Sequence, residues 1–289
     1  RARVRPHACC MQDAPRRPKR TQAKDSLPPF VIAGKHVSLG TLARVEMPVS
    51  RLPGGTWLSV PIAVVRGARP GPTVWLSGAI HGDELNGVEI VRELLDALSP
   101  ETFAGTVIAV PMVNVFGVLE GSRYLPDRRD LNRSFPGSAR GSLASRLAHL
   151  LMTEVVARSS FGIDFHTGSG GRSNLSQVRV DTTDANLLKV AKAFGAPLIL
   201  HAKSRTGSLR HAAKLRGVDY LLFEGGEALR FDRKAIDIGV AGALRVLGHL
   251  GLLPPHPPAT EASVMCEKST WIRARLGGIF RPRVALGER

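Results

Sequence analysis

The feature that most constrains this chain is a repeated alternation of apolar, strand-like runs with helical patterns. The first unit is a nearly continuous apolar run over 73–80, followed at once by a helical pattern over 84–98. A run with so few polar positions is typical of a strand buried on both faces, because helices cover both sides of such a sheet. The alternation predicts an α/β fold with a mixed, largely parallel sheet flanked by helices.

The same pattern continues to residue 250 and is preceded by a predicted hairpin. Segments 41–49 and 56–66 are rich in Val and Thr and are separated by Leu52-Pro53-Gly54-Gly55, which favours a turn. Further strands are expected over 106–113, 162–166, 197–201 and 220–224, and further helices over 142–157, 184–194 and 234–250. Two stretches without this periodicity, 114–140 and the Gly/Ser/Asn-rich 167–176, are expected to be functional loops.

Composition shifts divide the chain into four parts. We expect a disordered basic tail over 1–25 and one α/β domain over 26–253, which is long enough to enclose a sizeable core. A proline-rich linker over 254–260 then leads to a short segment, 261–289, with strand-like pieces.

The net charge of +16 lies mainly at the two ends of the chain. Residues 1–24 hold eight bases against one acid, and residues 271–289 hold five arginines against one glutamate, which leaves +5 for the residues between them. Only nine of the 40 bases are lysine, an arginine bias that GC-rich coding alone produces, and no basic stretch is interleaved with aromatic residues. We therefore expect no nucleic-acid partner.

Hydropathy and cysteine usage indicate the compartment. No run of 18 apolar residues is present, and no apolar core follows the basic N-terminal residues, so we expect no membrane association and a cytoplasmic protein. Three cysteines fit a reducing compartment. His7 beside Cys9 and Cys10 is a weak metal candidate because no fourth ligand is near.

The strongest chemical signal is His81-Gly82-Asp83-Glu84, at the carboxyl end of a predicted buried strand and the start of a helix. Ligands of open α/β sheets bind at this edge. An imidazole and a carboxylate three residues apart across such a turn can converge on one ion, and catalytic zinc takes three protein ligands from His and Glu or Asp. His-x-x-Glu alone is weak, because Glu84 also suits the first turn of a helix.

A third ligand is therefore needed. His166 ends another predicted strand in Asp164-Phe165-His166-Thr167-Gly168, and adjacent parallel strands bring their ends together. His201 and His211 are rival ligands, of which only His201 also lies at a strand end. Asp164 lies two residues before His166, on the same strand face, where it could accept the spare N–H of a ligand histidine.

Four motifs in this order resemble the succinylglutamate desuccinylase/aspartoacylase family, zinc-dependent amidohydrolases on a carboxypeptidase-like α/β fold. They are Ser77-Gly78-Ala79-Ile80-His81-Gly82-Asp83-Glu84, Ser122-Arg123-Tyr124, Asp130-Leu131-Asn132-Arg133-Ser134-Phe135-Pro136-Gly137 and Asp164-Phe165-His166-Thr167-Gly168. The likeness covers residues 30–289, and four ordered motifs are far more specific than one. The resemblance implies one zinc ion per chain, held by His81, Glu84 and His166.

The resemblance also implies the other roles. Amide hydrolysis needs a carboxylate that takes a proton from water and passes it to the leaving amine, and Glu224, at a third strand end before two glycines, matches the family's general base, with Glu227 as a rival. Arg123 matches the arginine that polarises the scissile carbonyl. Asn132 and Arg133 match the pair that holds a substrate carboxylate.

The predicted function is zinc-dependent cleavage of the amide bond of a small N-acyl amino acid, and a homo-oligomer is compatible with the sequence. The alternatives are a zinc carboxypeptidase acting on peptides, a catalytically weak, shortened family member, and a non-catalytic basic binding protein. The stretch between Tyr124 and Asp130 is longer than in aspartoacylases, and no tyrosine follows Glu224. These departures resemble members specific for N-acetyl-diaminobutyrate, whose side chain is cationic, whereas Arg133 and the basic body leave an anionic succinyl substrate open.

The final departure concerns the C-terminal segment. Residues 271–280 resemble the opening of the family's C-terminal β-domain, so we expect 261–289 to be part of that domain. A few strands cannot enclose a core of their own, and we expect this segment to be poorly ordered or to pack on the main domain.

Overall fold

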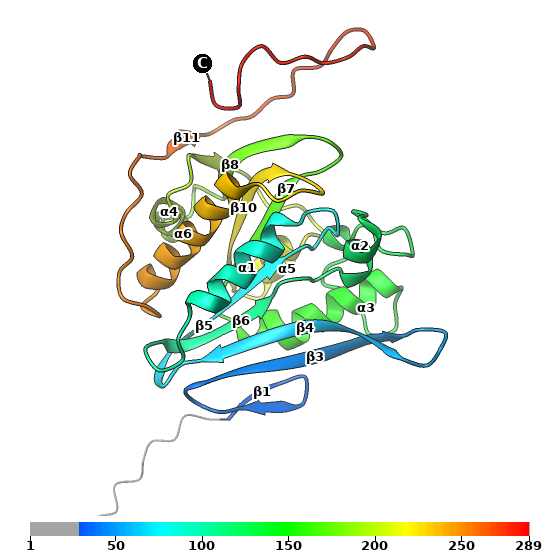
Figure 1. Cartoon of the computed structure of the whole chain (residues 1–289), viewed down its shortest axis with the longest axis vertical. Coiled ribbons are helices and arrows are strands. Elements are labelled where there is room, and N and C mark those ends of the chain that lie inside the picture. The colour runs from blue at the N-terminus through cyan, green and yellow to red at the C-terminus, as the bar shows by residue number, and fades with distance from the viewer. Residues whose placement is uncertain (1–28, 289) are drawn as a thin grey trace, which may run out of the picture.

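A computed structural model of the chain describes residues 29–288, and its centre is one nine-stranded sheet (Figure 1). The strand order is β11-β9-β8-β10-β7-β5-β6-β4-β3. Five of the eight neighbouring pairs are parallel, so the predicted mixed, largely parallel sheet is confirmed. The strands are β3 (Thr41–Arg51), β4 (Trp57–Arg66), β5 (Arg69–Gly78), β6 (Ala104–Val110), β7 (Phe161–Gly168), β8 (Ser173–Val180), β9 (Leu198–His201), β10 (Asp219–Glu227) and β11 (Val264–Cys266).

Helices cover both faces of this sheet. On one face lie α1 (Asn86–Ala97), α4 (Ala185–Phe194) and α6 (Arg233–His249), and on the other α3 (Leu143–Leu150) and α5 (Leu209–Leu215) (Figure 1). Each face has its own core: Ile90 and Leu94 of α1 are fully buried in the first, and Leu147 of α3 lies in the second. Burying a side chain of this size contributes about 1.5–3 kcal/mol, so the helical periodicity accounts for both layers.

The predicted hairpin is confirmed, since β3 and β4 pair in antiparallel register from Thr41 to Arg51. A second, smaller hairpin of β1 (Phe30–Ile32) and β2 (Lys35–Val37) was not predicted. The helix expected over 142–157 is shorter than predicted: α3 ends at Leu150, and a π-helical turn and a 3₁₀ turn follow it to Arg158.

The two expected loops contain regular structure. The prediction of a loop over 167–176 was wrong in part, because β7 runs to Gly168 and β8 begins at Ser173. The polar residues at the start of β8 did not indicate a strand. β8 is stabilised by its antiparallel ladder with β10, in which Phe223 lies opposite Val178. The stretch 114–140 contains α2 (Val115–Glu120) and a 3₁₀ turn over Leu131–Arg133.

The segment after the proline-rich stretch returns to the main sheet. β11 pairs in parallel with β9, with Met265 opposite Ile199, and the described residues after it form neither helix nor strand. Figure 1 shows this segment in red, running outside the edge of the sheet. The predicted tail over 1–25 and the His7, Cys9 and Cys10 group lie outside the described residues. Among residues 29–288, no helix is both long and apolar enough to span a membrane.

Candidate active site

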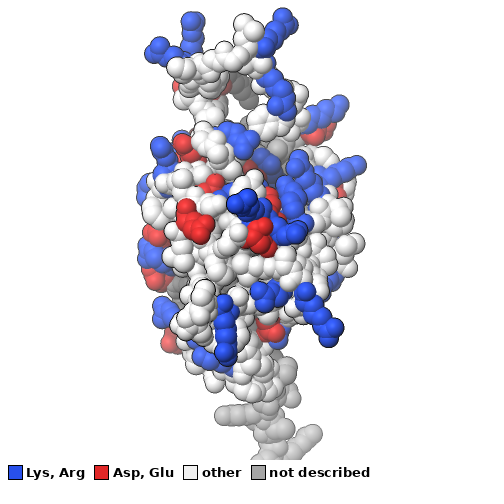
Figure 2. All heavy atoms as spheres, turned by 90° about the vertical axis from the view of Figure 1, so that its right-hand side faces the viewer, with Lys and Arg blue, Asp and Glu red and all other residues white. Residues whose placement is uncertain are grey.

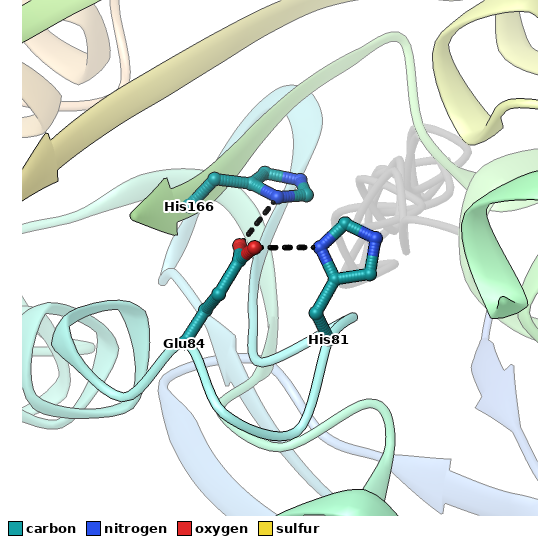
Figure 3. A group of neighbouring side chains, drawn as sticks. All are labelled: His81, Glu84 and His166. Atoms are coloured by element: carbon teal, nitrogen blue, oxygen red, sulfur yellow. Dashed lines mark hydrogen bonds and ion pairs between the residues drawn. The ribbon is translucent and has the colours of Figure 1, made fainter. Parts of the chain in front are cut away.

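Three predicted metal ligands meet at the carboxyl ends of β5 and β7. His81 and Glu84 stand on the turn from β5 to α1, and His166 stands on the neighbouring strand β7. One ligand atom of each lies within 4.8 Å of the other two, and all three residues are at most 4% exposed. Glu84 lies between the histidines, with its Oε1 2.9 Å from Nδ1 of His81 and its Oε2 2.8 Å from Nδ1 of His166 (Figure 3).

This group fits a zinc ion by its chemistry. Two imidazoles and one carboxylate form a ligand set of catalytic zinc sites, and both histidines turn the same nitrogen, Nδ1, toward the carboxylate. Burial raises the pKa of Glu84, but the facing histidines outweigh it and hold that pKa well below its usual value. Burial lowers the pKa of His166, while Asp164 and Glu84 raise it well above its usual value. A buried carboxylate between two imidazoles is thus an environment suited to a cation.

The turn that carries His81 and Glu84 is held by close backbone packing. Ala79, fully buried, adopts a left-handed conformation with φ 49°, and its carbonyl accepts a hydrogen bond from the Asn114 N–H at 2.9 Å. Gly82 packs directly against Gly117 of α2, where an added Cβ would lie 2.0 Å from a backbone carbon. Glycine is therefore required between the two ligands by close approach of the backbone.

Behind His166, Asp164 accepts three hydrogen bonds in the core. Its Oδ2 lies 2.7 Å from Nε2 of His166 and also accepts the Tyr220 hydroxyl at 2.7 Å. Its Oδ1 accepts the Ser77 hydroxyl at 2.7 Å. The sequence indicated Asp164 by its spacing from His166. Ser77 of β5 was quoted only as the first residue of a motif, and the contact of Tyr220 of β10 with Asp164 was not predicted.

Arg123 lies beside the metal group on the segment that follows α2. Its guanidinium donates to Glu84 at 3.3 Å, to the Ser169 hydroxyl at 2.6 Å and to Asp130 at 3.0 Å. An oxygen of Asp130 also lies 3.3 Å from Nε2 of His81 and so connects this arginine with a candidate metal ligand. In the sequence, Asp130 stands out only as the first residue of a motif, and its position beside Arg123 and His81 was not predicted.

Glu224 faces the same cleft from β10. It stands opposite His166 in the parallel register of β10 and β7. Its Oε2 accepts from Asn174 at 2.6 Å and pairs with Arg179 at 3.0 Å, both from β8. Burial raises the pKa of Glu224 and Arg179 opposes that rise. The rival Glu227 does not line this cleft, and its Oε2 lies 3.7 Å from Nε of Arg230.

Asn132 and Arg133 also reach the cleft. Oδ1 of the buried Asn132 accepts the Leu209 N–H at 2.9 Å, at the start of α5. This bond leaves the amide nitrogen of Asn132 for another partner. Arg133 is exposed and donates to the Asn132 carbonyl.

The rival histidines lie outside the metal group. His201 lines the cleft, but its Nδ1 contacts Thr182 at 2.8 Å. His211 lies on α5 with Nδ1 3.2 Å from the Ser204 hydroxyl. The structure thus brings His81, Glu84 and His166 together and separates the other two histidines from them.

The cleft above these residues has a volume of about 540 Å³ and a strongly basic wall. Lys and Arg are also more prominent than Asp and Glu on the face of the molecule drawn in Figure 2. A cleft of this volume has room for a small molecule. Its polar lining includes the three candidate metal ligands, the carboxylate of Glu224 and several guanidinium groups.

Comparisons with known proteins show which family the chain resembles in sequence and in fold. The catalytic-domain model of succinylglutamate desuccinylase/aspartoacylase matches residues 70–250. N-alpha-acetyl-L-2,4-diaminobutyric acid deacetylase of Halomonas elongata is 31% identical over 244 residues, which cover 79% of this chain and 70% of the relative. The structure of a succinylglutamate desuccinylase/aspartoacylase from Rhodobacter sphaeroides is similar to this chain with a TM-score of 0.70 and 30% sequence identity. The match covers 78% of this chain and 71% of the Rhodobacter chain.

A second solved relative is the product-bound ectoine utilization protein EutE (DoeB) from Ruegeria pomeroyi. It has a TM-score of 0.72 and 26% identity, and the match covers 80% of this chain and 75% of that one. The family match spans more than half of the chain, including the three clustered ligands and Glu224. The chain therefore belongs to the succinylglutamate desuccinylase/aspartoacylase family.

Proposed function

We propose that this protein is a zinc-dependent hydrolase that removes the acyl group from a small N-acyl amino acid. The observation that carries the proposal is the buried group of His81, Glu84 and His166 in one cleft with Glu224 and Arg123. The names of the relatives support it, because they describe deacetylases and desuccinylases. His81, Glu84 and His166 would hold the zinc. When bound, zinc would act as a Lewis acid that polarises the scissile carbonyl and lowers the pKa of water.

Glu224 is the proposed general base. Asn174 and Arg179 both hold its Oε2, which leaves Oε1 for the proton of the attacking water. The same oxygen then passes this proton to the nitrogen of the leaving amine. Burial of Glu224 raises its pKa toward neutrality, which suits a group that accepts and then returns a proton.

Arg123 and Arg133 are the proposed contacts to the scissile carbonyl and to the substrate carboxylate, respectively. Arg123 lies beside Glu84 and lines the cleft, and in the proposed reaction it would donate to the scissile carbonyl oxygen, where negative charge develops during attack. Arg133, with the amide nitrogen of Asn132, would hold the substrate carboxylate. Asp164 would orient His166 by accepting its Nε2–H, so that Nδ1 is free to bind metal.

The test combines metal analysis with a substrate panel. The zinc-loaded chain is expected to contain about one zinc ion per chain and to release free amine from N-acetyl or N-succinyl amino acids, but not from dipeptides. A chelator should abolish release, and added zinc should restore it. His166→Ala should lose zinc, whereas the control His211→Ala should keep it, because His211 lies outside the metal group.

Hydrolysis of peptides with no deacylation would favour the carboxypeptidase alternative. A zinc-free protein whose properties are unchanged in His166→Ala would overturn both enzyme functions.

A further inference from the structure

The strand that carries the proposed base becomes irregular directly after Glu224. β10 pairs with β7 without interruption from Asp219 to Glu224, which lies opposite His166. The next residue of β10 in register is Glu227, which lies opposite Gly168, so three steps along β10 match two steps along β7. One extra residue on β10 is a β-bulge, and bulges redirect side chains beside active sites. The ladder with β7 therefore does not by itself fix the backbone that follows Glu224.

Asn86 contacts this irregular segment from the helix that follows the turn of the candidate metal ligands. It is the first residue of α1, two positions after Glu84, and it is fully buried. Its amide nitrogen donates to the Gly225 carbonyl at 3.0 Å, and its amide oxygen accepts the Asp232 N–H at 2.9 Å. Gly225 directly follows the proposed base, and Asp232 caps the start of α6. One side chain thus holds both ends of the segment 225–232 against α1.

Gly226, between these two contacts, packs against the same side chain. It adopts a left-handed conformation with φ 76°, and an added Cβ would lie 2.6 Å from Nδ2 of Asn86. Further along the segment, the Leu229 N–H donates to the Asp83 carbonyl at 2.7 Å. Asp83 lies on the turn of the candidate metal ligands. The backbone after the proposed base is therefore held by residues that adjoin the metal ligands in the chain.

We propose that Asn86 is a positioning residue, which sets the place of the Glu224 carboxylate relative to the candidate metal ligands by holding the backbone after Glu224. The inference rests on the proposed deacylase function and adds a residue to it. Asn86 does not line the cleft, so it acts through Glu224 and not on the substrate. Proton transfer requires about 2.6–3.2 Å between the base and the water, and a misplacement of about 1 Å lowers a rate by about 100-fold.

Asn86→Ala removes both hydrogen bonds of this side chain. In the zinc-loaded full chain it should lower kcat for the best N-acyl amino acid by about 10- to 100-fold, change KM by less than about twofold and leave the zinc affinity unchanged. Asn186→Ala, at an exposed position in the first turn of α4, is the matched control and should behave as wild type. A wild-type kcat in Asn86→Ala would overturn the positioning role.

A double-mutant cycle distinguishes positioning of the base from a general structural role. In a Glu224→Gln background the base is absent, so adding Asn86→Ala should lower the remaining rate by less than about twofold. An equal loss in both backgrounds would overturn the positioning role and leave the deacylase function intact. If Asn86→Ala does not fold, Asn86→Asp takes its place, because the ionised side chain accepts the Asp232 N–H but has no donor for the Gly225 carbonyl. The same losses are expected, and a wild-type kcat would again overturn the role.

Crystal structures of the wild type and of the folded Asn86 variant separate this inference from the proposed function. We expect the Glu224 carboxylate to move by about 1 Å or more in the variant, while His81, Glu84 and His166 keep their positions. If the wild type hydrolyses no substrate, the proposed function fails, and these structures test the placement of Glu224 alone. A Glu224 carboxylate at its wild-type position in the variant would refute the inference in either case.

Discussion

Replacing Asp164 by asparagine is expected to weaken zinc binding without unfolding the protein. Asp164 is fully buried and accepts from His166, Tyr220 and Ser77. An asparagine that keeps its oxygen at the Oδ2 position would still accept from His166 and Tyr220, and its amide nitrogen would face the Ser77 hydroxyl. That hydroxyl can turn and accept, so the change removes the negative charge but leaves each neighbour a partner.

The size of the effect follows from the bond between Asp164 and His166. A hydrogen bond to a charged group contributes about 1.5–3 kcal/mol, compared with about 0.5–1.5 kcal/mol for a neutral one. Losing the charge therefore costs about 1–2 kcal/mol of metal-binding free energy. We expect a loss of zinc affinity of about 10-fold, at the lower end of the 10- to 100-fold range for partners of metal ligands.

Competition with a chromophoric chelator measures this affinity, and circular dichroism checks the fold. Asp219→Asn is the matched control, because it makes the same change at the exposed start of the same strand as Tyr220. An Asp164→Asn protein that is folded and binds zinc as tightly as the control would refute the orienting role of Asp164.

Further predictions concern the base, the pH profile, the turn and the metal. Glu224→Gln should lower kcat by about 10²–10⁴-fold and leave zinc affinity unchanged, which separates a proton-transfer role from a ligand role. Glu224 must be ionised to accept a proton, so activity is lost as the pH falls through the pKa of Glu224. Because Arg179 lowers this pKa, Arg179→Gln should raise it and move the acidic limb of the kcat/KM profile to higher pH. An acidic limb at the wild-type pH would show that Arg179 does not influence the pKa of the proposed base Glu224. Gly82→Ala should lower the free energy of unfolding by about 1–3 kcal/mol or more and weaken zinc binding, because the alanine Cβ would meet the Gly117 backbone. A denaturant midpoint equal to that of the wild type would contradict this packing. Chelation should lower the melting temperature, with recovery at excess zinc; equal melting temperatures would indicate that the folded state does not bind the ion.

Much of the fold was predictable because its signals are local. Each apolar run of the central strands, such as 73–80, is buried on both faces because of its own side chains, and the helix after it follows from its own periodicity. The predicted boundaries of the elements were less accurate. The residues at the start of β8 are typical of a polar loop, yet they form a strand because β10 and β9 pair with β8. Hydrogen bonding to distant segments is not visible in the residues of one segment.

The candidate site divides in the same way. His81 and Glu84 are three residues apart on one turn, so the sequence by itself determined that pair and the place of Asp164 on the strand of His166. Residue spacing left His201 as a rival of His166, and the family resemblance favoured His166. The tertiary structure adds the physical reason, because the register of β5 and β7 brings the strand end of His166 beside the turn of His81 and Glu84.

The same holds for the groups around the site. Tyr220 lies 56 residues from Asp164, and Arg179 lies 45 residues before Glu224, so their contacts depend on how strands distant in sequence pair within the sheet. Composition showed that the chain is rich in arginine, but only the fold placed Arg179 and Arg210 in the cleft, with Arg179 3.0 Å from Glu224. Residue types and local spacing determined the chemistry available to this protein, and the long-range pairing of strands determined which of those groups act together.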